Sequence, residues 1–186
     1  YDPLIRASLI HYQFETIHPF LDGNGRIGRM LIILYIMQQK LLSKPVLYVS
    51  YYLKKNQLEY YDRMAEIRKN GNYEQWVKFF LRSIAESAKD SVNMAYQLSS
   101  LHNQHLSMIL EDKRSNHDLK TLLEYIEQHP IMDIQHVSAA LSMSYNKVSR
   151  LIKKMIDIGI VRETTDKQRN RVFSYYKYLD VLRKDT

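Results

Sequence analysis

The sequence predicts a mainly α-helical protein, in which a helical bundle is followed by a small winged helix-turn-helix unit with a β-hairpin. Apolar residues recur at helical spacing along most of the chain, and only 5 Gly and 4 Pro interrupt them. Two short β-type segments near the C-terminal end flank a polar turn. We therefore expect two domains, at residues 1–112 and 113–186.

The first domain is expected to be entirely helical. The segment after Gly25 is apolar on nearly all sides, which is typical of a helix in the middle of a bundle. Asn70-Gly71-Asn72 interrupts the later helical pattern. The expected helices run from Pro3 up to His18, from Arg26 to Lys40, near Tyr51 to Lys69 and from Tyr73 to about Leu110, with a short segment at Val46 to Val49.

The second domain is expected to begin after a polar link at Lys113 to His117. Its pattern changes to short helices, which end at Pro130 and Gly159, and two strands follow them. The expected elements are helices around Leu119–Ile126, Val137–Leu141 and Ser144–Ile158, and strands at Ile160–Thr164 and Arg171–Tyr175. This order is typical of a winged helix.

Composition excludes several classes of protein. The 186 residues contain no Cys, which rules out disulfides, thiolate nucleophiles and Cys-bound metals. The longest apolar run, Met30 to Met37, is too short to span a membrane, so we expect a cytoplasmic protein. The start at Tyr1 lacks an initiator Met and a signal peptide, which indicates an internal cut in a longer protein. A net charge of +7 permits an anionic ligand.

The stretch from His18 to Arg29 carries the chemistry. Three of the 5 Gly fall within Gly23 to Gly28, immediately before and inside a buried helix. The free amides and positive dipole end of such a helix form an anion site, in which Gly23 and Gly25 can take positive φ. Asn24 can adopt a left-handed conformation and donate from its side-chain amide.

Charged groups around this loop indicate a polyphosphate ligand. Arg26 and Arg29, three residues apart on the first turns, can grip phosphate oxygens on one face. Asp22 would repel a phosphate unless Mg²⁺ lay between them. His18 supplies an imidazole that can accept a proton near neutral pH. The simpler alternatives are a connecting hairpin turn and a solvated pair of arginines.

The twelve residues His18-Pro19-Phe20-Leu21-Asp22-Gly23-Asn24-Gly25-Arg26-Ile27-Gly28-Arg29 resemble the signature of Fic-domain proteins, and the similarity extends from Pro3 to about Ala85. The resemblance implies a Fic-type helical bundle that transfers AMP from ATP to a Ser, Thr or Tyr hydroxyl of a target protein (AMPylation). It also implies that His18 is the general base, that Asp22 holds Mg²⁺, and that the nucleotide is bound by Gly23, Asn24, Gly25, Arg26, Gly28 and Arg29.

The resemblance also limits what can be expected. Only 17 residues precede His18, so the upstream part of a Fic domain is missing from this chain, and the fragment is expected to lack activity if that part is essential. Tyr60 and Tyr61 fall where relatives have aromatic residues near the adenine, although helix packing explains them equally well.

The second domain offers residues that could contact DNA. The helix that begins at Ser144 would be the recognition helix, and a partner protein could dock on the same unit instead. The candidate contacts, together with Lys167 on the predicted wing, are Tyr145, Asn146, Lys147, Arg150 and Arg169.

The function expected by this reasoning is that of a protein adenylyltransferase with an appended winged helix. The alternatives are a DNA-binding transcriptional regulator whose Fic-like domain senses nucleotide, and a Fic enzyme that uses another donor or removes AMP. The sequence leaves open the target protein, the presence of an upstream inhibitory helix and whether the chain forms a homodimer.

Overall fold

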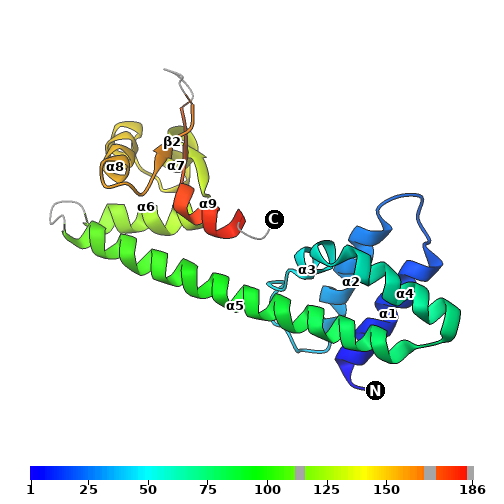
Figure 1. Cartoon of the computed structure of the whole chain (residues 1–186). Helices are drawn as coiled ribbons and strands as arrows, with labels where there is room; N and C mark the ends of the chain where they lie inside the picture. Colours follow the sequence, from blue (N-terminus) through cyan, green and yellow to red (C-terminus); the bar gives the residue numbers. More distant parts are fainter. Residues whose placement is uncertain (112–115, 166–170, 184–186) are drawn as a thin grey trace. The chain divides into compact units, whose positions relative to one another are not determined.

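The computed structural model describes residues 1–111, 116–165 and 171–183 and divides the chain into two compact units, residues 1–93 and 94–186 (Figure 1). Helices dominate both units, and one small sheet lies in the second, so the mainly α fold class is confirmed. The domain boundary expected between residues 112 and 113 lies outside the described residues and stays a prediction. No helix in the described ranges combines the length and the apolar character needed to cross a membrane.

The first unit is helical throughout. Asp2 starts the first helix, because its side chain accepts the Leu4 amide hydrogen at 2.8 Å and Pro3 follows it. The predicted third helix is broken at Asn56. The elements are α1 (Pro3–Ile17), α2 (Asn24–Gln38), α3 (Val49–Lys55), α4 (Gln57–Asn70) and the first part of α5 (Tyr73–Glu111).

α1 and α2 pack against each other and carry the loop between them. Gly28 makes this approach possible, because a Cβ built there would lie only 2.2 Å from Glu15 Oε1 and 3.2 Å from His11 Cε1. Trp76 of α5 is fully buried beside them, and its indole N–H donates to the Ser8 carbonyl oxygen at 3.0 Å. The two helices that position the loop are therefore fixed by a tight contact and a buried anchor.

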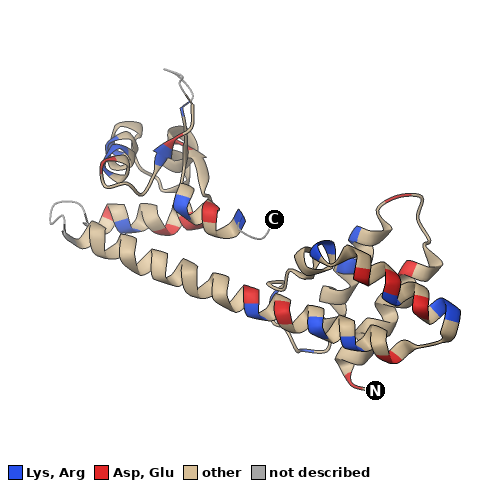
Figure 2. Ribbon diagram, viewed as in Figure 1, with Lys and Arg blue, Asp and Glu red and all other residues tan. Residues whose placement is uncertain are grey.

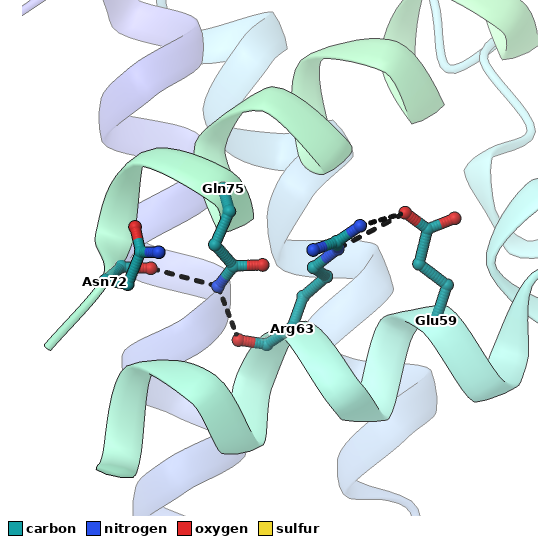
Figure 3. Close-up of polar contacts among 4 residues, drawn as sticks. All are labelled: Glu59, Arg63, Asn72 and Gln75. Carbon is teal, nitrogen blue, oxygen red and sulfur yellow. Dashed lines mark hydrogen bonds and ion pairs between the residues drawn. The ribbon is translucent and has the colours of Figure 1, made fainter. Parts of the chain in front are cut away.

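Polar contacts join α4 to the start of α5 (Figure 3). The Gln75 side-chain amide donates to the carbonyl oxygens of Arg63 and Asn72, both at 2.9 Å. Arg63 also donates from Nη2 to Glu59 Oε1 at 2.9 Å, one turn earlier on α4. Gly71, with φ 65°, ends α4 in the left-handed conformation that favours glycine. The predicted break at Gly71 is confirmed.

The second unit combines short helices with a three-stranded antiparallel sheet of order β1-β3-β2. Phe173 of β3 is buried and lies opposite both Met132 and Glu163 in the sheet. The elements after the last part of α5 are α6 (Asn116–Gln128), β1 (Ile131–Asp133), α7 (Ile134–Ala140), α8 (Tyr145–Asp157), β2 (Arg162–Glu163), β3 (Val172–Ser174) and α9 (Tyr176–Arg183).

Three features of this unit differ from the sequence expectation. The two predicted strands are present but shorter, and β1 and α9 were not predicted. β1 exists because its three residues pair with β3, which lies about 40 residues further along the chain. The expected link at Lys113 falls partly outside the described residues, while His117 belongs to α6.

Candidate active site

The loop from His18 to Gly23 joins the C-terminal end of α1 to the N-terminal end of α2. His18 ends α1 in a left-handed conformation, with φ 50° and ψ 57°, and its backbone N–H donates to the Phe14 carbonyl oxygen at 3.0 Å. The His18 side chain is exposed. A left-handed backbone at a non-glycine residue costs energy, so the local structure holds this imidazole at the end of α1 against that cost.

Asn24 closes the loop from inside. Its side chain is buried, its Oδ1 accepts the Phe20 amide hydrogen at 3.0 Å, and its Nδ2 donates to the Phe20 carbonyl oxygen at 2.6 Å. Asn24 is also the first residue of α2, not a left-handed residue of the loop. One hydrogen of the side-chain amide is therefore used within the loop, and the expectation that this amide serves an anion stays a prediction.

The N-terminus of α2 presents free backbone amides. Gly23 precedes the helix with φ 82° and has no side chain to cap it. The first amide bonded back within this turn is that of Ile27, which donates to the Gly23 carbonyl oxygen at 3.0 Å. The earlier amides of a helix have no such partner and carry the positive end of its dipole. Gly25 lies inside the helix without a positive φ, so that expectation is wrong.

Two guanidinium groups lie near these amides. Arg29 folds back over the first turn, since its Nη1 lies 3.2 Å from the point that a Cβ on Gly25 would occupy. Arg26 and Arg29 line one cavity of about 220 Å³, which is completed by apolar residues and by Tyr48 and Ser50. The structure thus brings the two arginines to one hollow beside the start of α2, as their spacing predicts.

Asp22 is the one acidic residue of the loop. Its Oδ1 accepts the Gly23 amide hydrogen at 2.7 Å, and its Oδ2 lies 3.8 Å from Arg26 Nη2. The Asp22 side chain is 94% exposed, so this ion pair contributes little to stability. Within the described ranges, no three His, Cys, Asp or Glu side chains gather as a metal site. A single exposed carboxylate does fit Mg²⁺, because this ion is usually bound by one or two carboxylates together with substrate phosphates.

A buried polar cluster lies beneath the loop. His11 Nε2 is 3.1 Å from the Tyr60 hydroxyl, and burial lowers the pKa of His11 to about 4, with Arg29 acting in the same direction. Burial also raises the pKa of Glu15, while the charges of His18 and Arg29 oppose that shift. His11 is therefore neutral at pH 7, and its side chain lies at the contact between α1 and α2.

Two residues predicted to contact the nucleotide also pack within the first unit, and their nucleotide roles stay predictions. Gly28 is buried at the contact between α1 and α2. Tyr60 packs against Trp76 and His11 in the core of the first unit, and burial raises the pKa of its hydroxyl. Tyr61 is 57% exposed and touches the Tyr60 ring at 5.2 Å between centroids, so a nucleotide contact there stays a prediction.

The cavity also includes residues that the sequence did not single out. Tyr48 and Ser50 lie some twenty residues beyond Arg29, in the segment that leads into α3. Tyr48 is 51% exposed in the structure. The spacing of the chain alone did not indicate that this segment returns to α2.

Four of the residues predicted to contact DNA lie on α8, in the second unit: Tyr145, Asn146, Lys147 and Arg150. Tyr145, Asn146 and Arg150 are exposed. Lys147 is bound to Asp118 of α6, with Nζ 2.8 Å from Oδ1. Arg169 and Lys167 lie outside the described residues.

Comparisons with known proteins match the loop and its surroundings. The model of the Fic/DOC family matches residues 1–36. "Protein adenylyltransferase Fic" of Drosophila virilis is 28% identical over 126 residues, which are 68% of this chain and 24% of that protein. "Protein adenylyltransferase fic-1" of Caenorhabditis briggsae is 49% identical over 37 residues, which are 20% of this chain and 7% of that protein.

A solved structure is also similar. The crystal structure of a Fic family protein from Desulfovibrio desulfuricans G20 has a TM-score of 0.49 and 20% identity, and the match covers 94% of this chain and 49% of that chain. The present chain spans about a quarter of the length of the Drosophila relatives it matches.

Proposed function

We propose that this chain is part of a Fic-type protein adenylyltransferase, which transfers AMP from ATP to a hydroxyl group of a target protein. The observation that carries the proposal is the arrangement of one imidazole, one set of free helix amides and two guanidiniums around a single loop. The family match on residues 1–36 contains the whole of this loop and supports the same assignment. The relatives named as adenylyltransferases support the reaction type.

In the proposed reaction, each group of the loop has a separate role. His18 takes the proton from the target hydroxyl, whose oxygen then attacks the α-phosphorus of ATP. A bond forms between that oxygen and the α-phosphorus, the bond from the α-phosphorus to the bridging oxygen breaks, and pyrophosphate leaves with its electron pair. The amides at the start of α2 stabilise charge on the phosphate oxygens. Arg26 and Arg29 hold the β- and γ-phosphates.

Mg²⁺ would be held by Asp22 together with the phosphates, and when bound it neutralises their charge. The exposed position of the Asp22 carboxylate beside the first turn of α2 fits that role. Asn24, bonded to Phe20, would keep the loop in the shape that exposes the amides.

The test is the transfer of label from ATP to protein. The chain is incubated with Mg²⁺ and ATP labelled on either the α- or the γ-phosphate, with and without added protein extract. We expect label on protein from α-labelled ATP alone, since the γ-phosphate leaves with pyrophosphate. Label from γ-labelled ATP would contradict adenylyl transfer, and so would the absence of label from either when the full-length protein is tested.

The His18→Ala variant tests the role of the imidazole. Loss of a general base lowers rates by about 10²–10⁴-fold, so we expect labelling to fall by that factor with the fold intact by circular dichroism. His129→Ala, which removes an exposed imidazole from the second unit, is the matched control and should label normally. A fully active His18→Ala variant would remove His18 from the mechanism.

The mass added to the modified protein identifies the donor. Mass spectrometry after reaction with several nucleotides should give an adduct of AMP from ATP. An adduct of another nucleotide or of a phosphocholine-like group would keep the loop chemistry but change the substrate. Removal of AMP from an already modified protein would show that the enzyme removes this group rather than adds it.

A further inference from the structure

The second unit contains its helices and strands in the order expected for a winged helix. α7 and α8 follow each other after β1, and β2 and β3 form an antiparallel pair after α8. α8 is the longer of the two helices and has one buried face, formed by Val148, Leu151, Ile152 and Met155. On its other side, Asn146, Arg150 and Lys153 are exposed.

The face of α8 opposite its buried residues is polar and basic. Asn146, Arg150 and Lys153 recur at spacings of four and three residues and are all exposed, so they form a stripe along the helix. Tyr145 precedes them and is 53% exposed. We call Asn146, Arg150 and Lys153 the α8 stripe.

The charges around the stripe leave it cationic. α8 carries no Asp or Glu before its last residue, Asp157, and Figure 2 shows blue segments on this helix. Two carboxylates of the unit are already paired with other residues: Asp118 binds Lys147 of α8, and Glu163 binds Arg171 through two contacts. Within the described ranges no ion pair is present at Arg150 or Lys153.

A second group of polar residues lies next to the start of α8. A cavity of about 320 Å³ is lined by Tyr145 of α8, His136 of α7 and Arg171 before β3, among others. The cavity also contains the Asp133 carboxylate, which accepts the His136 amide hydrogen at 3.0 Å and contacts the His136 ring. The Tyr145 side chain is therefore available beside the stripe to contact a phosphate, whereas Asp133 and His136 are bound to each other and Arg171 is bound to Glu163.

We propose that the second unit binds double-stranded DNA with the α8 stripe in the major groove. A helix of 13 residues is about 20 Å long and about 10–12 Å wide, and the major groove is about 12 Å wide. Arg side chains pair with guanine and Asn side chains with adenine through two hydrogen bonds each. Arg150 and Asn146 are placed to read bases, while Lys153 and Tyr145 contact the backbone. The interface is in a different unit from the adenylyl-transfer loop.

The test is fluorescence anisotropy with the full chain and labelled oligonucleotides. The probe is a mixed-sequence duplex longer than two helical turns, measured at several salt concentrations beside a single strand of the same composition. We expect tighter binding to the duplex, and affinity that falls as salt rises, with a slope of about 0.9 per phosphate contact. No duplex binding at low salt, or binding that is equal for the single strand, would overturn the proposal.

Variants locate the interface. Arg150→Ala/Lys153→Ala should weaken duplex binding by about tenfold or more and make the salt slope shallower. Lys89→Ala/Lys120→Ala removes the same number of charges from exposed positions elsewhere and should bind within about twofold of the parent. Equal weakening by both double variants would show a diffuse charge effect and overturn the assignment of α8. Unchanged duplex binding by the α8 double variant would also overturn that assignment, and it would favour a protein-docking role for the stripe.

Discussion

At the level of single residues, two side chains of the site are positioned by contacts within the protein: Asn24 by Phe20, and Arg29 by the first turn of α2. Asn24 is buried and bonded twice to Phe20, so its contribution is the shape of the loop. Arg29 folds over Gly25, so it reaches the start of α2 from one turn away. In the proposed mechanism the chemistry belongs to His18, the free amides and the arginines.

Arg29→Ala should weaken binding of ATP more than binding of AMP. The γ-phosphate would lose a charge-assisted contact, which is worth about 1.5–3 kcal/mol, or roughly tenfold or more in Kd. Calorimetric titration of both nucleotides in the presence of Mg²⁺ measures the difference. Arg6→Ala, an exposed arginine on α1, is the control and should bind both nucleotides as the parent does. An equal loss for ATP and AMP would show that Arg29 does not hold the terminal phosphates.

The residue spacing predicted the loop components because they lie within twelve consecutive residues. It did not predict Tyr48 or Ser50 beside the arginines, because these residues belong to a later segment, at the start of α3, that folds back to the arginines of α2. Tyr60 could equally be a packing residue or a nucleotide contact from sequence alone. In the structure its hydroxyl lies 3.1 Å from His11 Nε2 of α1, which shows the packing contact, and the nucleotide contact stays a prediction.

At the level of helices and strands, the contact between α1 and α2 determines where the loop sits. Gly28 lets the two helices approach, and Glu15 and His11 fill the space that a side chain would occupy. The helix pattern and the breaks at Gly71, Pro130 and Gly159 were predicted, because each depends on local sequence. The strand β1 and the helix α9 were not, because their formation depends on pairing and packing with distant residues.

Gly28→Ala tests this contact. The added Cβ would lie 2.2 Å from Glu15 Oε1 and 3.2 Å from His11, so packing must shift, and we expect a loss of about 1–3 kcal/mol in the free energy of unfolding. Urea unfolding measures the change. Gly25→Ala lies on the same helix, where the Cβ meets only the mobile end of Arg29 at 3.2 Å. That variant should have parent-like stability; an equal loss in both would contradict a specific contact at Gly28.

At the level of the whole molecule, both units contain a buried neutral imidazole. Burial lowers the pKa of His11 in the first unit and of His105 in the second, each to about 4. The positive charge of Arg29 contributes for His11, and Lys177 contributes for His105. His105 is also hydrogen-bonded to Tyr175 at 2.7 Å, inside the core of its unit.

The two imidazoles predict how stability changes with pH. Between pH 6.5, the ordinary pKa of histidine, and about 4, the unfolded chain binds more protons than the folded chain. The free energy of unfolding should therefore fall as pH decreases through that range, with no contribution from these groups above pH 6.5. Urea unfolding at a series of pH values measures this, and His11→Gln and His105→Gln should each reduce the slope. His129→Gln, at an exposed position, is the control; an unchanged slope in both buried-site variants would contradict the assignment.

In the proposed mechanism, one loop brings a nucleoside triphosphate to the amides of α2 with an imidazole beside it. The most direct measurement is the crystal structure of the chain with Mg²⁺ and an ATP analogue that cannot be cleaved between the α- and β-phosphates. We expect the phosphates on the amides at the start of α2, the guanidiniums of Arg26 and Arg29 on the outer phosphates, and the ring of His18 facing the α-phosphorus. A nucleotide bound away from α2, or a His18 ring turned from the phosphorus, would contradict the account.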